Sequence, residues 1–224
     1  MDDNLIVDTV DADLDYRGKE AQIQKLIADT EFTQLRSENL RVEVDEQLAT
    51  LKNLGTFHFY TEIDTSSVIR TILAMNRISR QNPNQVFTLI FNSGGGGVTD
   101  GFALFDFIAE LRQRGHKVIT KVQGIAASMA AVVCQAGSER VMTPNAYLMF
   151  HQISTSGLPG PLRQNRDRID WAERLQSRSE KVVYERMRKD ADFDEISKRW
   201  NHNEWFVDAD EALDLGLIDR ISYT

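Results

Sequence analysis

Apolar residues follow two alternating patterns along the chain from Thr56 to Phe150. Short apolar runs predict strands at Thr56–Tyr60, Val86–Phe91, Val118–Val122, Arg140–Met142 and Tyr147–Phe150. Between these runs, apolar residues at helical spacing predict helices over about 68–78, over 102–112 and from Ala126 onward. Val86–Phe91 is nearly continuous, as in a strand that is buried on both faces of a parallel sheet. Strands that alternate with helices form βαβ units, so the pattern predicts an α/β fold with a mostly parallel sheet.

The segment that precedes this pattern differs in both hydropathy and charge. Residues 1–18 mix aspartates with few apolar residues, which is typical of a flexible segment. Loose helical spacing follows from Lys19 to Leu51, and alternation at Arg41–Val44 resembles a short strand. Residues 1–50 carry 13 acids and 5 bases, whereas residues 51–224 carry 21 of each. We therefore expect an acidic N-terminal arm, residues 1–55, that docks on a folded body, residues 56–224, or on a partner.

The C-terminal third begins with a loop rich in Ser, Gly and Pro, S-T-S-G-L-P-G-P, directly after His151-Gln152-Ile153. A long charged helix is predicted over Leu162–Lys189, and its sparse apolar residues indicate that it is either solvated or seated between subunits. The motif D-A-D-E-A predicts a further helix start, and Arg220–Tyr223 predicts a closing strand.

Composition excludes several classes of protein. A net charge of −8 argues against a general nucleic-acid binder and against a protein that binds anionic membranes. The single cysteine, Cys134, forms no internal disulfide, which fits a reducing cytoplasm. No apolar run approaches the roughly 20 residues of a membrane span, and the N-terminus is acidic where a signal peptide is basic. We expect a cytoplasmic protein.

One hydroxyl stands out in the small-residue stretch Val122–Gly137, where Ser128 is surrounded by Gly, Ala, Val, Ile and Met. Gly124 is expected to end the preceding strand, with a helix beginning near Ser128. Such a helix N-terminus holds a nucleophile rigidly and favours developing negative charge. The alternative is a close-packed helix in which Ser128 is a tolerated core hydroxyl. Functional sites of parallel sheets lie at the carboxyl ends of the strands, where the Gly94–Gly97 run and His151 also fall.

An activated serine needs a base and an oxyanion hole. His151 is the candidate base, whereas His58, His116 in a surface turn and His202 are interpreted as exposed or structural histidines. The Gly94–Gly97 run offers free N–H groups to an oxyanion. A phosphate loop is disfavoured because no Gly-Lys-Ser or Gly-Lys-Thr follows these glycines.

Four motifs resemble the Clp protease proteolytic subunit (ClpP) family in order and approximate spacing: F-N-S-G-G-G-G-V-T-D-G, G-I-A-A-S-M-A-A, T-P-N-A-Y-L-M-F-H-Q and F-V-D-A-D-E-A-L-D-L-G-L-I-D. The resemblance covers about 56–224. It implies a ClpP/crotonase-like fold with a protruding handle helix, at about 162–189. It also implies a serine endopeptidase that acts on peptides or unfolded proteins inside stacked heptameric rings, which a hexameric AAA+ unfoldase feeds. No cofactor, metal, nucleic acid or membrane is implied.

By this resemblance, Ser128 is the nucleophile, His151 the general base, and Gly95 and Met129 the oxyanion donors. The family usually has proline at Gly94 and an aliphatic residue at Gly97, and both replacements loosen the loop.

The third catalytic residue departs from the family pattern. The family's aspartate is expected at Trp200, or at Asn201 after a shift of one residue, and neither residue is a carboxylate. We predict that the amide oxygen of Asn201 holds the His151 tautomer, as asparagine does in Cys-His-Asn proteases. Glu204 and Asp208 are the alternative carboxylates nearby.

Four functions remain open on the sequence. A Clp-like ring peptidase ranks first, followed by a phage-type head maturation protease, which often carries a K-E-T-W-F-like stretch where this chain has H-N-E-W-F. A catalytically silent ring subunit and a crotonase-type acyl-CoA enzyme rank below these two.

Overall fold

The computed structural model describes residues 22, 24–30, 32–34, 36, 55–154, 160–202 and 204–223. The chain divides into two units, Met1–Lys52 and Asn53–Thr224. Within the first unit the described residues are helical and exposed. The expectations for residues 1–18, for the short strand at 41–44 and for the loop at 155–159 lie outside the described residues.

The second unit is built on a sheet whose strands are mostly parallel. Seven strands are assigned in the described residues: β1 (Thr56–Phe59), β2 (Val86–Ser93), β3 (Lys117–Ala127), β4 (Glu139–Met142), β5 (Tyr147–Phe150), β6 (Trp205–Asp208) and β7 (Arg220–Ile221). The order is β1-β2-β3-β4-β7, and β5 pairs with the far end of β3. Every pairing is parallel except that of β5 with β6. The predicted α/β fold with a mostly parallel sheet is confirmed.

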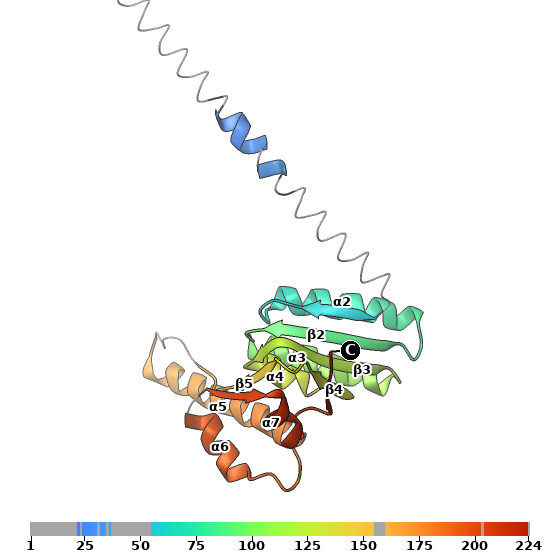
Figure 1. Ribbon diagram of the computed structural model, residues 1–224. Helices are drawn as coiled ribbons and strands as arrows, with labels where there is room; N and C mark the ends of the chain where they lie inside the picture. Colours follow the sequence, from blue (N-terminus) through green and yellow to red (C-terminus); the bar gives the residue numbers. More distant parts are fainter. Residues whose placement is uncertain are drawn as a thin grey trace, which may run out of the picture. The chain divides into compact units, whose positions relative to one another are not determined.

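The helices of this unit are α2 (Thr65–Gln81), α3 (Val98–Gln113), α4 (Met129–Cys134), α5 (Leu162–Tyr184), α6 (Phe193–His202) and α7 (Ala209–Asp214). The first three connect successive parallel strands, and because such crossovers are right-handed they cover the same face of the sheet. In Figure 1, α5, α6 and α7 gather around β5 at the other end of the unit. None of the helices in the described part of the chain is long and apolar enough to cross a membrane.

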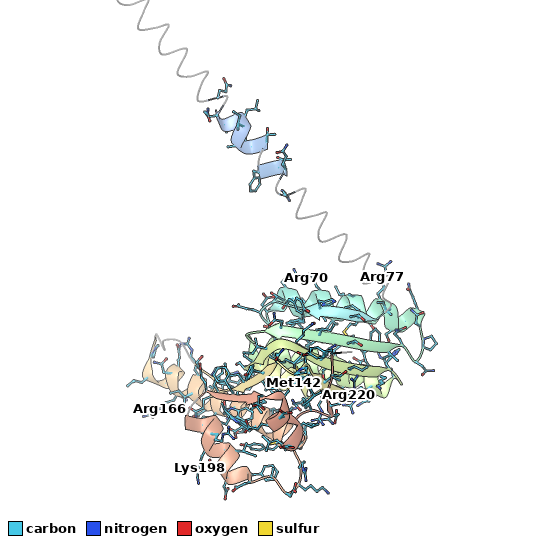
Figure 2. The ribbon with its side chains drawn as sticks, in the orientation of Figure 1. Arg70, Arg77, Met142, Arg166, Lys198 and Arg220 are labelled. Atoms are coloured by element: carbon cyan, nitrogen blue, oxygen red, sulfur yellow. The ribbon has the colours of Figure 1, made fainter. Side chains whose placement is uncertain are left out.

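The core lies between the sheet and the helices α2–α4. Its largest fully buried side chains include Phe59, Phe87, Phe91, Leu104 and Ile108. Alternate residues of β2 on the opposite face are partly buried or exposed, so the expectation that this strand is buried on both faces is wrong for the single chain. Figure 2 shows the outer side of α2, where Arg70 and Arg77 are exposed.

Four local predictions need correction. Strand β3 does not end at Gly124 but runs to Ala127, because its pairing partner changes from β4 to β5 and the ladder continues. The next helix therefore begins at Met129 rather than at Ala126. The handle helix α5 ends at Tyr184, five residues before the expected position. His116 does not lie at the surface: it is buried, and its Nε2 lies 2.7 Å from the hydroxyl of Ser79.

Candidate active site

Ser128 occupies a sharp turn between a strand and a helix. The last β3–β5 pair joins Ala127 to Met149, and the Ser128 N–H extends this contact by donating to the Met149 carbonyl at 2.7 Å. The chain then turns directly into α4, which leaves Ser128 at φ 54° and ψ −126°. A residue with a side chain is strained at a positive φ, and a strained turn between a strand and a helix exposes the side chain at its tip.

The glycine run is held against the segment that follows β1 by short hydrogen bonds. The carbonyl of Gly95 accepts the Ile63 N–H at 2.7 Å, and the Gly97 N–H donates to the Ile63 carbonyl at 2.7 Å. The Ser93 hydroxyl donates to the Thr61 carbonyl at 2.6 Å and accepts the Gly95 N–H at 3.2 Å. These bonds fix a loop that the glycines alone would leave loose.

Gly95 lies directly against the Ser128 turn. A Cβ at Gly95 would fall 2.6 Å from the Ala127 carbonyl oxygen, 2.8 Å from the Ser128 Cβ and 3.1 Å from the Met129 nitrogen. Gly95 also has a φ of +96°, which side chains rarely adopt. The structure therefore brings both predicted oxyanion donors next to Ser128.

Met129 is the first residue of α4, so its N–H has no acceptor within the helix. Its side chain packs on Gly101 of α3, at a place where any Cβ would overlap it. This close approach of α3 and α4 explains a glycine inside a helix. It also fixes the position of the Met129 backbone.

His151 follows the last residue of β5 and lines the same small cleft as Ser128. The rest of the cleft wall comes from apolar side chains and from α5: Val98, Met129, Val132, Phe150, Ile153, Gln176, Ser179 and Trp200. The two residues are predicted from separate motifs, and the change of partner along β3 brings them together. Both are partly exposed, so a substrate can reach them.

Asn201 lies in the last turn of α6, and its side chain forms hydrogen bonds with Gln152 and Ser197 rather than with the His151 ring. Its amide oxygen accepts the side-chain N–H of Gln152 at 3.1 Å, and its amide nitrogen donates to the Ser197 hydroxyl at 3.1 Å. Among the described residues, no hydrogen-bonding partner of the His151 imidazole is found. The role of Asn201 as the orienting residue stays a prediction.

The antiparallel pairing of β5 with β6 sets His151, directly after β5, and Glu204, directly before β6, at the same end of the ladder. The last antiparallel pair of the ladder joins Phe150 to Trp205, the residues directly before His151 and directly after Glu204. Glu204 is exposed and precedes β6.

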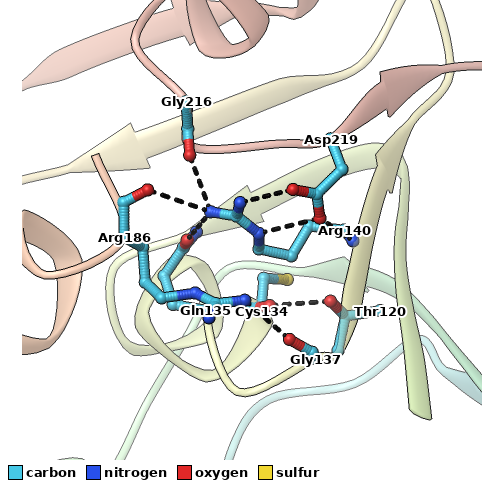
Figure 3. A network of polar contacts seen from close by, with 8 residues as sticks. All are labelled: Thr120, Cys134, Gln135, Gly137, Arg140, Arg186, Gly216 and Asp219. Carbon is cyan, nitrogen blue, oxygen red and sulfur yellow. Dashed lines mark hydrogen bonds and ion pairs between the residues drawn. The ribbon is translucent and has the colours of Figure 1, made fainter. Parts of the chain in front are cut away.

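A second polar cluster, absent from the sequence predictions, anchors the far end of α4 (Figure 3). Arg140 donates to both carboxylate oxygens of Asp219, at 3.1 and 2.6 Å, to the Gly216 carbonyl at 2.7 Å and to the Gln135 side chain at 3.2 Å. Arg186 donates to the Gly137 carbonyl at 2.8 Å. Cations near a helix C-terminus oppose its negative dipole end, so this cluster holds the helix that begins beside Ser128.

The ionisation of this cluster is fixed by its neighbours. Burial raises the pKa of Asp219, but the hydrogen bonds and the charge of Arg140 outweigh it and hold that pKa below its ordinary value. Burial also raises the pKa of the nearby Cys134 thiol far above its ordinary value, which disfavours the reactive thiolate form of this cysteine. In the described parts of the chain, no group of three or more His, Cys, Asp and Glu residues is placed to hold a metal ion.

Comparison with known proteins finds a family model and relatives whose names agree with one another. A family model described as Clp protease matches residues 41–224. ATP-dependent Clp protease proteolytic subunit 1 of Chlamydia caviae is 27% identical over 189 residues, which is 83% of this chain and 94% of that protein. Proteolytic subunit 3 of Parasynechococcus marenigrum is 30% identical over 165 residues, 72% of this chain and 78% of that protein. Proteolytic subunit 3 of Streptomyces coelicolor is 29% identical over 165 residues, 72% of each chain.

Proposed function

Because the chain belongs to the Clp protease family, we propose that it is a serine endopeptidase that hydrolyses peptides or unfolded proteins. The observation that carries this proposal is the cleft that Ser128 and His151 share, with the backbone of Gly95 against the serine. The relatives are named as ATP-dependent Clp protease subunits, which favours this function over a phage head maturation protease. A crotonase-type acyl-CoA enzyme needs no Ser-His pair and is disfavoured for that reason.

In the proposed mechanism, the Ser128 hydroxyl attacks the scissile carbonyl while the His151 imidazole takes its proton. The N–H groups of Gly95 and Met129 stabilise the oxyanion of the tetrahedral intermediate. His151 then returns the proton to the leaving amine, and a water molecule activated by the same imidazole hydrolyses the acyl-enzyme. In this structure the Gly95 N–H donates to the Ser93 hydroxyl at 3.2 Å. This bond therefore has to lengthen when the same N–H donates to the oxyanion.

The proposed assembly is a homo-oligomer of stacked heptameric rings that encloses the active sites. The relatives are called proteolytic subunits and ATP-dependent, which supports an assembly that works with a separate ATP-driven AAA+ unfoldase. The exposed side of α5 supports a contact between subunits, since Leu162 is 83% and Trp171 53% exposed in the single chain.

The experiment that tests the peptidase proposal is labelling of the assembled protein with a fluorophosphonate probe. We expect a single adduct, mapped by mass spectrometry to Ser128, because only an activated hydroxyl reacts with this reagent. Native mass measured on the same sample reports whether rings are present. Assembled rings that stay unlabelled would contradict the peptidase proposal and favour a catalytically silent ring subunit.

The third catalytic residue is proposed to be Glu204, with Asn201 as the competing prediction. We expect Glu204→Gln to lower kcat for a short peptide by about 10- to 100-fold, since an exposed carboxylate orients the imidazole but is partly screened by water. The matched variant Asn201→Ala is expected to change kcat by less than about threefold. A larger loss in Asn201→Ala, together with faster hydrolysis by Asn201→Asp, would assign the role to Asn201 instead.

A further inference from the structure

The segment that carries His151 leaves the sheet just before the histidine. The last pair of the β5–β6 ladder is Phe150 with Trp205, so the residues that follow lack its regular support. Two side chains from different helices take over. The indole N–H of Trp200, in α6, donates to the His151 carbonyl at 3.0 Å. The side-chain oxygen of Gln176, in α5, accepts the Ile153 N–H at 2.9 Å.

Both side chains are themselves held in place. Trp200 is only 2% exposed, and its ring packs on Phe150 at 4.8 Å and on Tyr184 at 6.1 Å between centroids. The amide nitrogen of Gln176 donates to Glu180 at 2.8 Å, which fixes the direction of its oxygen. The buried indole N–H of Trp200 and the oriented amide oxygen of Gln176 therefore hold the two successive peptide units that follow His151.

We propose that Trp200 and Gln176 are positioning residues for His151. This inference rests on the proposed function, because it assigns them the task of keeping the base within reach of Ser128. Catalysis is sensitive to such placement, since a shift of about 1 Å can lower a rate about 100-fold. The two hydrogen bonds restrain the backbone next to His151, where the hydrogen bonds of the β5–β6 pair have ended.

The chain contains a matched control for Trp200. Trp205 also packs on Phe150, with a centroid distance of 5.3 Å and a similar ring tilt, and it is buried to the same degree. Its indole N–H has no hydrogen-bonding partner in the described structure. Replacing either tryptophan by phenylalanine shortens a buried ring that packs on Phe150, but only Trp200→Phe removes a bond to the histidine backbone.

The experiment compares peptide hydrolysis by the assembled variants Trp200→Phe, Trp205→Phe and Gln176→Met. We expect kcat to fall about 5- to 10-fold in Trp200→Phe and in Gln176→Met, since each loses one backbone hydrogen bond, with KM within about twofold. Trp205→Phe is expected to keep kcat within about twofold. Equal losses in the two tryptophan variants, or losses confined to KM, would overturn the proposal and leave Trp200 a packing residue.

A second readout does not depend on peptidase activity. With histidine labelled at its Cε1 carbon, the His151 resonance is expected to shift or broaden in Trp200→Phe and to stay in place in Trp205→Phe. An unchanged resonance in Trp200→Phe would overturn the positioning role. If the wild-type protein neither labels nor cleaves while this spectral difference is present, the peptidase proposal fails and the backbone restraint stands.

Discussion

Replacing Ser128 by alanine is expected to lower kcat for a peptide substrate by about a millionfold, the loss typical of a removed serine nucleophile. The oxyanion donors stay in place in this variant, so a residual rate of about 10³–10⁴ over water is expected from them alone. His151→Ala is expected to lose as much as Ser128→Ala, and the double variant no more than either, because the two residues act as one unit. Steady-state kinetics on a fluorogenic peptide measures all three.

The stability of the same variants provides the control. Ser128→Ala keeps the Cβ, so the strain at φ 54° persists and the free energy of unfolding is expected to change by less than about 0.5 kcal/mol. Ser128→Gly relieves that strain and is expected to raise the free energy of unfolding by about 1 kcal/mol while remaining equally inactive. Hydrolysis by Ser128→Ala within about tenfold of wild type would show that another group is the nucleophile.

The repeating pattern of strands and helices was readable in the sequence because each element is encoded locally. Val86–Phe91 and Tyr147–Phe150 are apolar runs of strand length, and they became β2 and β5 with few changes at their ends. His151 lies directly after a strand and Ser128 lies at the start of a helix, as the sequence predicts. The prediction that the strand ends at Gly124 is wrong because β3 pairs with a second strand, β5, directly after this glycine. Pairing with a distant segment here outweighs the local tendency of glycine to end a strand.

What the sequence did not reveal depends on contacts between distant segments. Helix α6 was not predicted, although it supplies both Trp200 and Asn201. The placement of Glu204 and His151 at the same end of the β5–β6 ladder depends on strand register, which is set by pairing across many intervening residues. The bond between Arg140 and Asp219 likewise joins two charged residues that look like ordinary surface positions in the sequence.

Gly95→Ala is the second variant with a large expected effect, a loss of about 1000-fold in kcat. The new Cβ would lie 2.6 Å from the Ala127 carbonyl oxygen and 3.1 Å from the Met129 nitrogen, and neither backbone atom can move aside as a flexible side chain would. The loop must therefore retreat from Ser128 and take its N–H donor with it. Loss of one oxyanion donor alone costs about 100- to 1000-fold in kcat, and the left-handed φ of +96° adds strain.

The neighbouring glycine separates the loss of a donor from a general disturbance of the loop. A Cβ at Gly94 meets no atom within 4 Å, so Gly94→Ala is expected to keep kcat within about threefold. Kinetics and thermal unfolding of both variants, measured side by side, test the difference. A Gly95→Ala protein that is folded and fully active would exclude its N–H as an oxyanion donor. A large loss of kcat confined to Gly95→Ala, together with slow reaction of Ser128 with the fluorophosphonate probe, would place the oxyanion hole between Gly95 and Met129. The reason is that Gly95, unlike Gly94, contacts the turn that carries the serine.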